Sequence, residues 1–448
     1  MRTFFTTAAL RQDRLIGGAA VLAATQFLAS AAGLLRDRLL TQTFPGLDVV
    51  DVYIAAFRPS DLLFQVAVMA GLSTIFVPLL ARYRADNNEK EMSRLLSSVM
   101  TVGFLGFGAL AVILAALLPW IAPRIVGFEG RSLDLYVTFA RMALLTNALF
   151  VLGNALGQYL VTVQRYVIYG LTPVLYTLGT IAGTVWLTPH YGPLGPMLGT
   201  LGGAVLYVLL RFAGVLHRGY VPSATVWHPD LVRMGWLMIP RMVALGALQL
   251  ELLVFDSLAS FLDNGSVTIN AYARNFESVV IGVVGIALAQ SAFSPLSQAA
   301  ARGEMGRFRT YLRKGTIVAG GAGVLCSVVL VALAPFEAWL VHLTAAFQPF
   351  FWCLVFYAVA VPFECLNHLL LRSFYALHST TIPAAMSVIG GVLGMAVSWM
   401  LLRPLGIYAI PGGFAAGQVV MTVGLAGFLP WRMRRQVSIS SSIARESA

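Results

Sequence analysis

The chain of 448 residues has little charge and only three cysteines. Asp, Glu, Lys and Arg together make up 11% of the residues, and the cysteines show no CxxC spacing. A soluble domain cannot cover a large apolar surface with so few charged side chains. The cysteine spacing argues against a zinc site or a disulfide framework. The HExxH, GxSxG and P-loop motifs are also missing, so we expect a protein that is not an enzyme and that holds no cofactor.

Long apolar segments take the place of the missing charge, because 58% of the residues are hydrophobic. A helix needs about 20 apolar residues to cross the roughly 30 Å hydrocarbon core of a bilayer. Twelve windows meet this length: 15–35, 52–81, 95–121, 135–163, 166–188, 195–216, 231–262, 268–300, 315–342, 346–375, 380–402 and 406–430. The sequence therefore predicts an all-α integral membrane protein with twelve transmembrane helices.

The basic residues are unevenly divided between the connecting segments. With the N-terminus inside the cell, 21 of the 30 Lys and Arg residues fall in cytoplasmic segments, Arg211 among them, and 5 fall in outer ones. This bias predicts that both termini are cytoplasmic. The net charge of +11 then reflects topology and contact with membrane lipids. Because the basic residues form no single stripe, we expect no nucleic-acid partner.

An internal repeat relates the two halves of the chain. The segment around Arg58 and Asp61 can be laid over the segment around Arg274 and Glu277, with the same Arg-x-x-acid spacing. A Phe-x-Pro triplet follows about twenty residues later in each copy, and both copies run into a basic segment. Each half has six helices, and an even number of crossings returns the chain to the side of the membrane where it began. The halves would therefore be parallel repeats with a binding site between them near the membrane midplane.

This repeat predicts two pseudo-symmetric six-helix lobes. The N-terminal lobe comprises residues 1–217, and a polar cytoplasmic linker comprises residues 218–230. The C-terminal lobe comprises residues 231–448 and ends in a short basic tail. Two matched lobes joined by such a linker suit alternating access across a membrane.

The repeated Arg-x-x-acid motif places charge inside two predicted spans. Arg58 and Asp61 lie one turn apart and share a helix face, and a charged side chain that faces lipid costs about 2.5 to 3.5 kcal/mol or more. We therefore expect this face to turn inward and to contact substrate. The alternative is an ion pair near the outer headgroups, which would have to recur by chance in the second half.

Further ionisable residues lie in the second half of the chain. Glu251 and Asp256 fall in the seventh window, and Glu364 and His368 fall in the tenth. They are candidates for coupling transport to Na+ or H+, because burial can move the pKa of such groups toward 7. The alternative is that they form structural hydrogen bonds between or within helices.

Five stretches carry a family resemblance: GLLRDRLLTQTF (33–44), VDVYIAAFR followed by LSTIFVPLLARYR (50–84), ALGQYLVTVQRYVIYGLTPVLYTL (155–178), FLDNGSVTINAYAR (261–274) and LLLRSFYALHSTTIP (369–383). Their order and spacing resemble the MurJ/MviN lipid II flippases of the multidrug/oligosaccharidyl-lipid/polysaccharide (MOP) exporter superfamily, which also includes the MATE transporters. The resemblance implies a bacterial cytoplasmic (inner) membrane protein that opens alternately to each side and moves an undecaprenyl-diphosphate-linked peptidoglycan precursor outward. We expect a monomer, with Na+, H+ or the membrane potential as the candidate driving force.

The resemblance also implies which residues bind the diphosphate and sugar. By motif position these residues are Arg36 and Asp37 at the end of the first helix, Asp51 at the start of the second, and Arg274. We add the other members of the repeated motif, Arg58, Asp61 and Glu277. Guanidinium groups suit this task because they bind diphosphate oxygens in a bidentate manner and keep their charge.

Some positions depart from the family pattern. Ser30, Phe64 and Gln65 stand where the family usually has arginines, and the segment 68–71 lacks the glutamate of the family motif. These changes remove charge from the expected cavity. They leave open a different lipid-linked oligosaccharide as substrate, or a cation-coupled MATE-like export of small molecules.

Overall fold

The computed structural model describes residues 2–72, 76–217, 220 and 225–446, without the side chains of 2–16, 19, 240, 244 and 436–446. Within these residues, every regular element is helical. Residues 73–75 of the second predicted window lie outside the described part of the chain. The same holds for residues 218–219 and 221–224 of the predicted linker.

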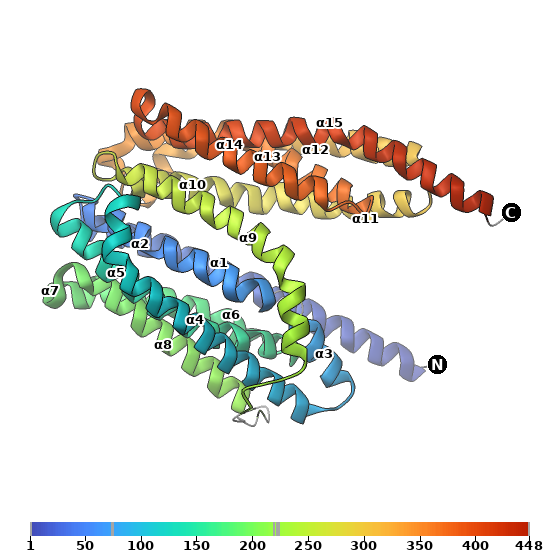
Figure 1. Ribbon diagram of the computed structural model, residues 1–448, viewed down its shortest axis with the longest axis horizontal. Helices are drawn as coiled ribbons and strands as arrows, with labels where there is room; N and C mark the ends of the chain where they lie inside the picture. Colours follow the sequence, from blue (N-terminus) through green and yellow to red (C-terminus); the bar gives the residue numbers. More distant parts are fainter. Residues whose placement is uncertain (1, 73–75, 218–219, 221–224, 447–448) are drawn as a thin grey trace. The chain divides into compact units, whose positions relative to one another are not determined.

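The helices follow one another with short connections (Figure 1). The first half contains α1 (Arg2–Thr43), α2 (Asp48–Phe64), the π-helix η1 (Gln65–Met69), α3 (Val77–Ala85), α4 (Glu89–Ile125), α5 (Gly130–Thr162), α6 (Tyr166–Ala182), η3 (Gly183–Leu187), α7 (Thr188–Tyr191), η4 (Gly192–Leu194) and α8 (Gly195–Leu216). The second half contains α9 (Asp230–Ser260), α10 (Ser266–Val280), the π-helix η5 (Ile281–Ile286), α11 (Ala287–Ala301), α12 (Met305–Leu340), η6 (Thr344–Ala346), α13 (Phe347–Ala376), α14 (Thr381–Leu405), η7 (Gly406–Tyr408) and α15 (Ala409–Glu446). Each of the twelve predicted windows coincides with one of these helices or with a run of two or three consecutive elements.

The chain forms two compact units, Met1–Gln249 and Leu250–Ala448, which divide within α9. In the first unit, α5 packs against α2, α4 and α8, and α6 packs between α1 and α8. In the second unit, α13 packs against α10, α11, α12 and α15, and α14 lies along α15. Each unit therefore surrounds a central helix, α5 or α13.

Nine stretches of the described residues are long and apolar enough to cross a membrane. Two of them, Tyr166–Leu216 and Thr381–Arg435, have 51 and 55 residues, which at about 1.5 Å per residue exceeds one crossing of a roughly 30 Å core. Each reverses direction at a glycine, Gly192 or Gly406, with φ of +56°. Glycine adopts this left-handed conformation without steric cost. Each of these two stretches thus provides two of the predicted crossings.

The backbone shows the internal repeat more fully than the side chains do. Among the described residues, ten have positive φ, and they form five pairs separated by 212 to 218 residues. The pairs are Leu47 with Gly265, Asn87 with Gly303, Gly130 with His342, Gln164 with His378, and Gly192 with Gly406. A π-helix also begins seven residues after Arg58 in one unit and seven after Arg274 in the other. The predicted repeat therefore extends to the connections between helices.

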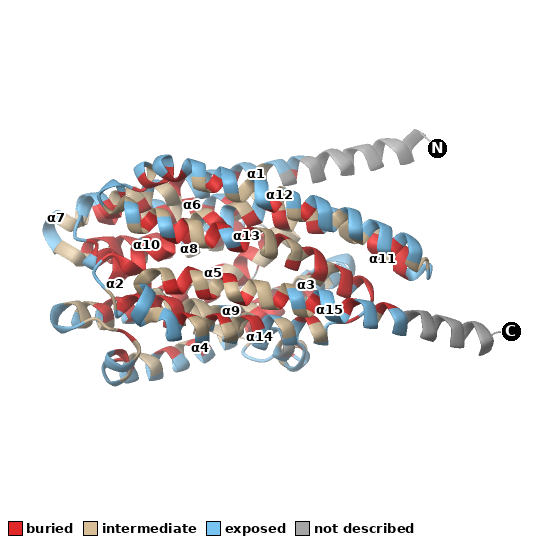
Figure 2. Ribbon diagram, turned by 90° about the horizontal axis from the view of Figure 1, so that it is seen from above, coloured by how far each residue is buried: buried red, intermediate tan, exposed pale blue. Residues whose placement is uncertain are grey.

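The outer faces of several helices are exposed (Figure 2), and large apolar residues lie on them. On α4, Leu105 and Val112 are 61% and 69% exposed, and on α12, Leu325 and Val328 are 64% and 61% exposed. In water such apolar surfaces would promote aggregation, whereas the acyl chains of a bilayer solvate them. These faces are therefore the ones expected to meet the bilayer.

The structure corrects the expected place of Arg211. This residue lies within α8, with 2% of its surface exposed, and not in a connecting segment. Its guanidinium donates to the Thr172 hydroxyl (2.8 Å) and to the Gly153 carbonyl (2.8 Å). It also lies 4.0 Å from the centre of the Tyr207 ring. Arg211 thus joins α5, α6 and α8 at one end of the first unit. Its position near the end of an apolar window misled the sequence assignment.

The described part of the predicted linker is attached to the first unit. The Tyr220 and Ser97 hydroxyls are 2.6 Å apart, and the Ser98 hydroxyl donates to the Thr225 carbonyl. At the end of the linker, the Tyr83 hydroxyl donates to Asp230 (2.7 Å). Burial and this hydrogen bond raise the pKa of Tyr83 to about 12, so the phenol remains a donor at physiological pH. The described part of the linker is therefore fixed to the first unit.

Candidate functional site

A chelated ion pair lies near the end of α1. The Arg36 Nη2 and Nε atoms donate to Asp37 Oδ1 at 2.6 and 2.9 Å. Asp37 is 5% exposed, whereas the Arg36 side chain keeps 28% of its surface. The buried carboxylate therefore holds the guanidinium in one orientation and leaves part of it accessible.

The charged residues of α2 face the interior of the first unit. Asn147 on α5 donates from Nδ2 to Asp61 Oδ1 (2.9 Å) and to the Ser60 hydroxyl (2.8 Å). Arg58 is an electrostatic neighbour of Asp61. Asp51, which lies about two turns before Arg58 on the same helix, is 3% exposed. The Arg58 and Asp61 face thus lies against α5, and not against lipid alone.

Tyr176 on α6 connects the ion pair of α1 with the charged face of α2. Both Arg36 and Asp61 are electrostatic neighbours of its hydroxyl. Sequence reasoning did not identify Tyr176 or Asn147. Asn147 was detectable in principle, since it is one of only three side-chain amides in the largely apolar α5, with Asn154 and Gln158. Tyr176 carried no such signal, because aromatic residues are common in these helices.

Arg274 is the central charged residue of the second unit. It is 8% exposed, and within the described residues its Nη1 atom has no hydrogen-bond partner. One turn before it on α10, Asn270 accepts a hydrogen bond from the buried Tyr357 hydroxyl of α13 (2.8 Å). Arg274 and Asp256 are both electrostatic neighbours of Tyr357. A buried guanidinium with an unused donor has capacity for an anionic ligand.

Two buried carboxyl groups meet beside Arg274. Glu277 on α10, which is 2% exposed, lies within hydrogen-bond reach of Glu364 on α13. Glu251 on α9 is an electrostatic neighbour of both Glu364 and Arg274. Two carboxylates can only accept hydrogen bonds, so this contact requires a shared proton or a cation. The pair is therefore a candidate site for one proton or one monovalent cation.

His368 lies one turn beyond Glu364 on α13, and its charged neighbour is Arg372. Between them, the Asn367 Nδ2 atom donates to the Gln418 Oε1 atom of α15 (2.9 Å). The structure thus brings Glu364 together with Glu277 and Glu251, whereas His368 occupies the next turn. That the two polar clusters, one in each unit, face a common central chamber stays a prediction.

Comparison with known proteins relates the chain to one protein family and to one fold. The family described as "Lipid II flippase MurJ" matches residues 43–445. Lipid II flippase MurJ of Burkholderia cenocepacia is 25% identical over 61% of this chain and 55% of its own length. A probable lipid II flippase MurJ of Vibrio cholerae is 28% identical over 64% of this chain and 57% of its own length. The chain thus spans little more than half of these two relatives.

Other matches extend over nearly the whole chain. A probable lipid II flippase MurJ of Bdellovibrio bacteriovorus is 22% identical over 94% of this chain and 83% of its own length. A solved structure of lipid II flippase MurJ in an inward closed conformation covers 95% of this chain and 91% of its own, with TM-score 0.76 and 19% identity. An inward-facing multidrug resistance MATE transporter of the MOP superfamily covers 94% and 99%, with TM-score 0.70 and 16% identity. The all-α fold of MOP transporters is therefore confirmed.

Proposed function

Because the chain belongs to the lipid II flippase MurJ family, whose members are multi-pass membrane transporters and not enzymes, we propose that it moves lipid II or a close analogue across the cytoplasmic membrane. The substrate would carry a diphosphate between an undecaprenyl tail and a glycan. Outward transport would proceed by alternating access of the two repeated units. We also propose that the protein acts as a monomer and that both of its termini lie in the cytoplasm.

The buried guanidinium of Arg274 is the observation that carries this proposal. Its Nη1 atom has no partner within the described residues, although a buried charged donor without an acceptor is costly. A diphosphate oxygen would supply that acceptor and would be bound in the planar geometry that guanidinium groups favour. Arg36, which Asp37 holds in place, would provide a second such group from the other repeat. We assign Asp51, Arg58, Asp61 and Glu277 to the surrounding polar lining.

For ion coupling, we propose the carboxyl cluster of the second unit. Uptake of one H+ or Na+ between Glu277 and Glu364 would reduce the negative charge beside Arg274. Arg274 would then bind an anionic ligand more strongly. Glu251 and Asp256 would lie on the path of the ion, and His368 would lie one turn from it. In proteoliposomes, Glu364→Gln should make transport insensitive to an imposed ion gradient. Unchanged gradient dependence would exclude this site.

The experiment that tests the main proposal is replacement of a depleted flippase. This gene is expressed in a bacterium whose own lipid II flippase is depleted, and lipid II exposed on the outer leaflet is measured. We expect restored exposure and growth. Correct membrane insertion with no lipid II exposure would exclude lipid II as the substrate.

One observation favours a second candidate, a different lipid-linked oligosaccharide. Phe64, at a position where related proteins are expected to have arginine, is 7% exposed and packs edge-on against Phe107 of α4, with ring centroids 6.1 Å apart. An apolar residue locked into the core cannot bind a sugar or phosphate. A panel of diphosphate-linked glycans in the proteoliposome assay would separate the two candidates.

A further inference from the structure

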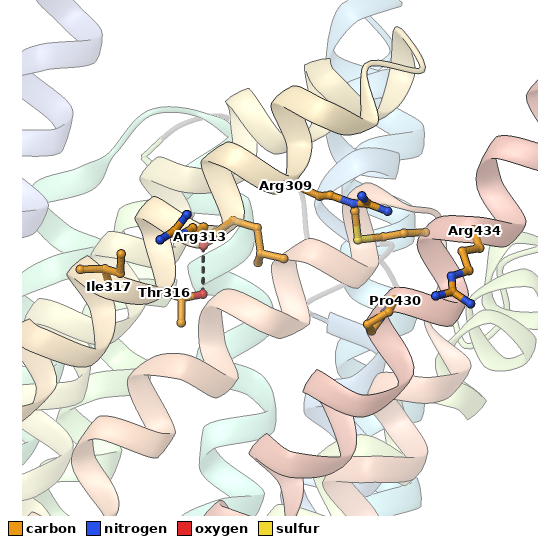
Figure 3. Close-up of a pocket in the computed structure, with 8 residues that line it drawn as sticks. Arg309, Arg313, Thr316, Ile317, Pro430 and Arg434 are labelled. Carbon is orange, nitrogen blue, oxygen red and sulfur yellow. Dashed lines mark hydrogen bonds between the residues drawn. The ribbon is translucent and has the colours of Figure 1, made fainter.

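A groove opens between α12 and α15 in the second unit (Figure 3). Its volume is about 580 Å³, and it is open along one side. The residues that line it come from the first turns of α12 and from the region of α15 around Pro430: Arg309, Leu312, Arg313, Thr316, Ile317, Pro430, Met433 and Arg434. α12 carries no residue of the clusters described above, and Gln418 of α15, which bonds to Asn367, does not line the groove.

The charged part of the groove is entirely basic. Arg309, Arg313 and Arg434 line it together with no acidic residue, and Figure 3 shows Arg309 extending from α12 toward α15. Nearby arginines are already engaged, since Arg307 pairs with Glu304 (2.8 Å) and Arg435 lies over the Trp431 ring. Within the described residues, the three groove arginines make no ion pair with a carboxylate. The groove therefore presents uncompensated positive charge.

The remaining lining is mostly apolar and comes from both helices, with Leu312, Thr316 and Ile317 on α12 and Pro430 and Met433 on α15. Ile317, two turns beyond Arg309, is 64% exposed, and the Thr316 hydroxyl bonds to its own helix at Leu312 (2.9 Å). α12 has 36 residues, about 54 Å at 1.5 Å per residue, so its first turns extend beyond a roughly 30 Å hydrocarbon core. Trp431, 51% exposed beside the groove, is the residue type that anchors at the headgroup level.

We propose that this groove binds one anionic phospholipid of the cytoplasmic leaflet. Its phosphodiester oxygens would accept hydrogen bonds from the Arg309 and Arg434 guanidinium groups, which fit phosphate in a bidentate manner. The upper part of an acyl chain would lie along Ile317 and Pro430. The start of α12 and the end of α15 lie on the side where the sequence places most basic residues, and anionic lipids give that leaflet its negative surface potential. This ligand is a resident lipid and not the transported substrate.

The test uses the full chain in detergent and native mass spectrometry with phosphatidylglycerol and phosphatidylethanolamine. The variant Arg309→Gln/Arg434→Gln is compared with Arg302→Gln/Arg435→Gln, which removes the same charge from neighbouring positions outside the groove. We expect at least a fivefold loss of phosphatidylglycerol binding in the first variant and less than a twofold change in the second. Equal losses in the two variants would show general electrostatic attraction and would overturn the proposal.

A second variant covers the case in which the arginine changes unfold the protein. Ile317→Trp fills the apolar end of the groove and keeps all three guanidinium groups, so it should also lower phosphatidylglycerol binding. Glycerol phosphate, which has no acyl chain, should not compete. Competition by glycerol phosphate, or displacement of phosphatidylglycerol from the groove by lipid II, would show an anion site or a substrate subsite and would contradict the proposal. This experiment does not require transport, so its outcome is independent of the flippase assay.

Discussion

At the scale of single residues, the most informative side chain is Arg274, whose guanidinium is buried but incompletely bonded. Arg274→Ala and Arg36→Ala should each reduce lipid flipping at least tenfold, which corresponds to about 1.4 kcal/mol of lost interaction. The measurement is transport of a diphosphate-linked glycan in proteoliposomes, with insertion checked by size-exclusion chromatography.

Arg403 provides the matched control for these variants, since it is exposed at the end of α14. Arg403→Ala should transport as well as the unmodified protein. Arg274→Lys should recover only part of the activity, because an ammonium group is a point charge without the planar fork. Retained transport by both alanine variants at Arg36 and Arg274 would refute the roles assigned to them.

Arg211 has a structural task instead. Arg211→Ala should lower the free energy of unfolding by about 3 kcal/mol, because it leaves a cavity and unsatisfied groups between three helices. The exposed Arg82, whose side chain keeps 68% of its surface, is the control, and Arg82→Ala should change stability by less than about 0.5 kcal/mol. Thermal unfolding in one detergent measures both. Similar shifts for the two variants would contradict the structural role of Arg211.

Single residues also show where sequence reasoning succeeded and where it could not. The Arg58 and Asp61 pair was found because charge inside an apolar window is conspicuous. Arg211 was misplaced, since a helix end and a buried arginine near a helix end look alike in sequence. The Glu277 and Glu364 contact was not predicted, because it joins α10 and α13 over a separation that helical periodicity does not encode.

At the scale of elements, glycines set the distance between paired helices. A Cβ atom on Gly203 of α8 would lie 2.6 Å from the Tyr176 carbonyl of α6, and one on Gly417 of α15 would lie 2.5 Å from the Gly390 carbonyl of α14. Side chains at these positions would force the backbones apart. The same close approach thus occurs in both units and holds α6 to α8 and α14 to α15.

Two adjacent glycines of α8 test this interpretation. Gly203→Ala should destabilise the protein by about 1 to 3 kcal/mol through overpacking. Gly202→Ala should be neutral or stabilising by up to about 1 kcal/mol, since alanine has the higher helix propensity and nothing lies within 4 Å of its Cβ. Comparing the thermal unfolding of the two variants separates the effect of helix packing from the effect of helix propensity. An equal effect of the two substitutions would contradict close helix contact.

The π-helices mark the limit of prediction for elements. Hydrophobic windows located all twelve spans, because each needs only a sustained apolar run. The hydrophobic windows could not show that η1 and η5 are π-helices, whose turns are about one residue longer than those of an α-helix. A local change from α- to π-helix leaves the amino-acid composition unaltered. Such turns often occur at functional sites, and η1 and η5 both follow the charged motif, whereas the π-helix η3 does not.

At the scale of the whole molecule, the orientation in the membrane stays a prediction from charge. In a variant without Cys326, Cys353 and Cys365, Lys90→Cys should react with a membrane-impermeant thiol reagent only after the cells are permeabilised. Glu129→Cys, at the opposite end of α4, should react in intact cells. Both positions are exposed, so accessibility depends on sidedness alone. Labelling with the reverse pattern would place the termini outside.

The shared π-helical turn has a consequence for the history of the chain. A π-helical turn at the same place in both halves, seven positions after the arginine, is most simply explained by a single insertion that both halves inherited. The parsimonious order of events is that a six-helix ancestral gene already carried the insertion and was then duplicated and fused. Ancestral-sequence reconstruction of that half-length gene should therefore yield a polypeptide that retains the insertion and pairs with itself as a homodimer.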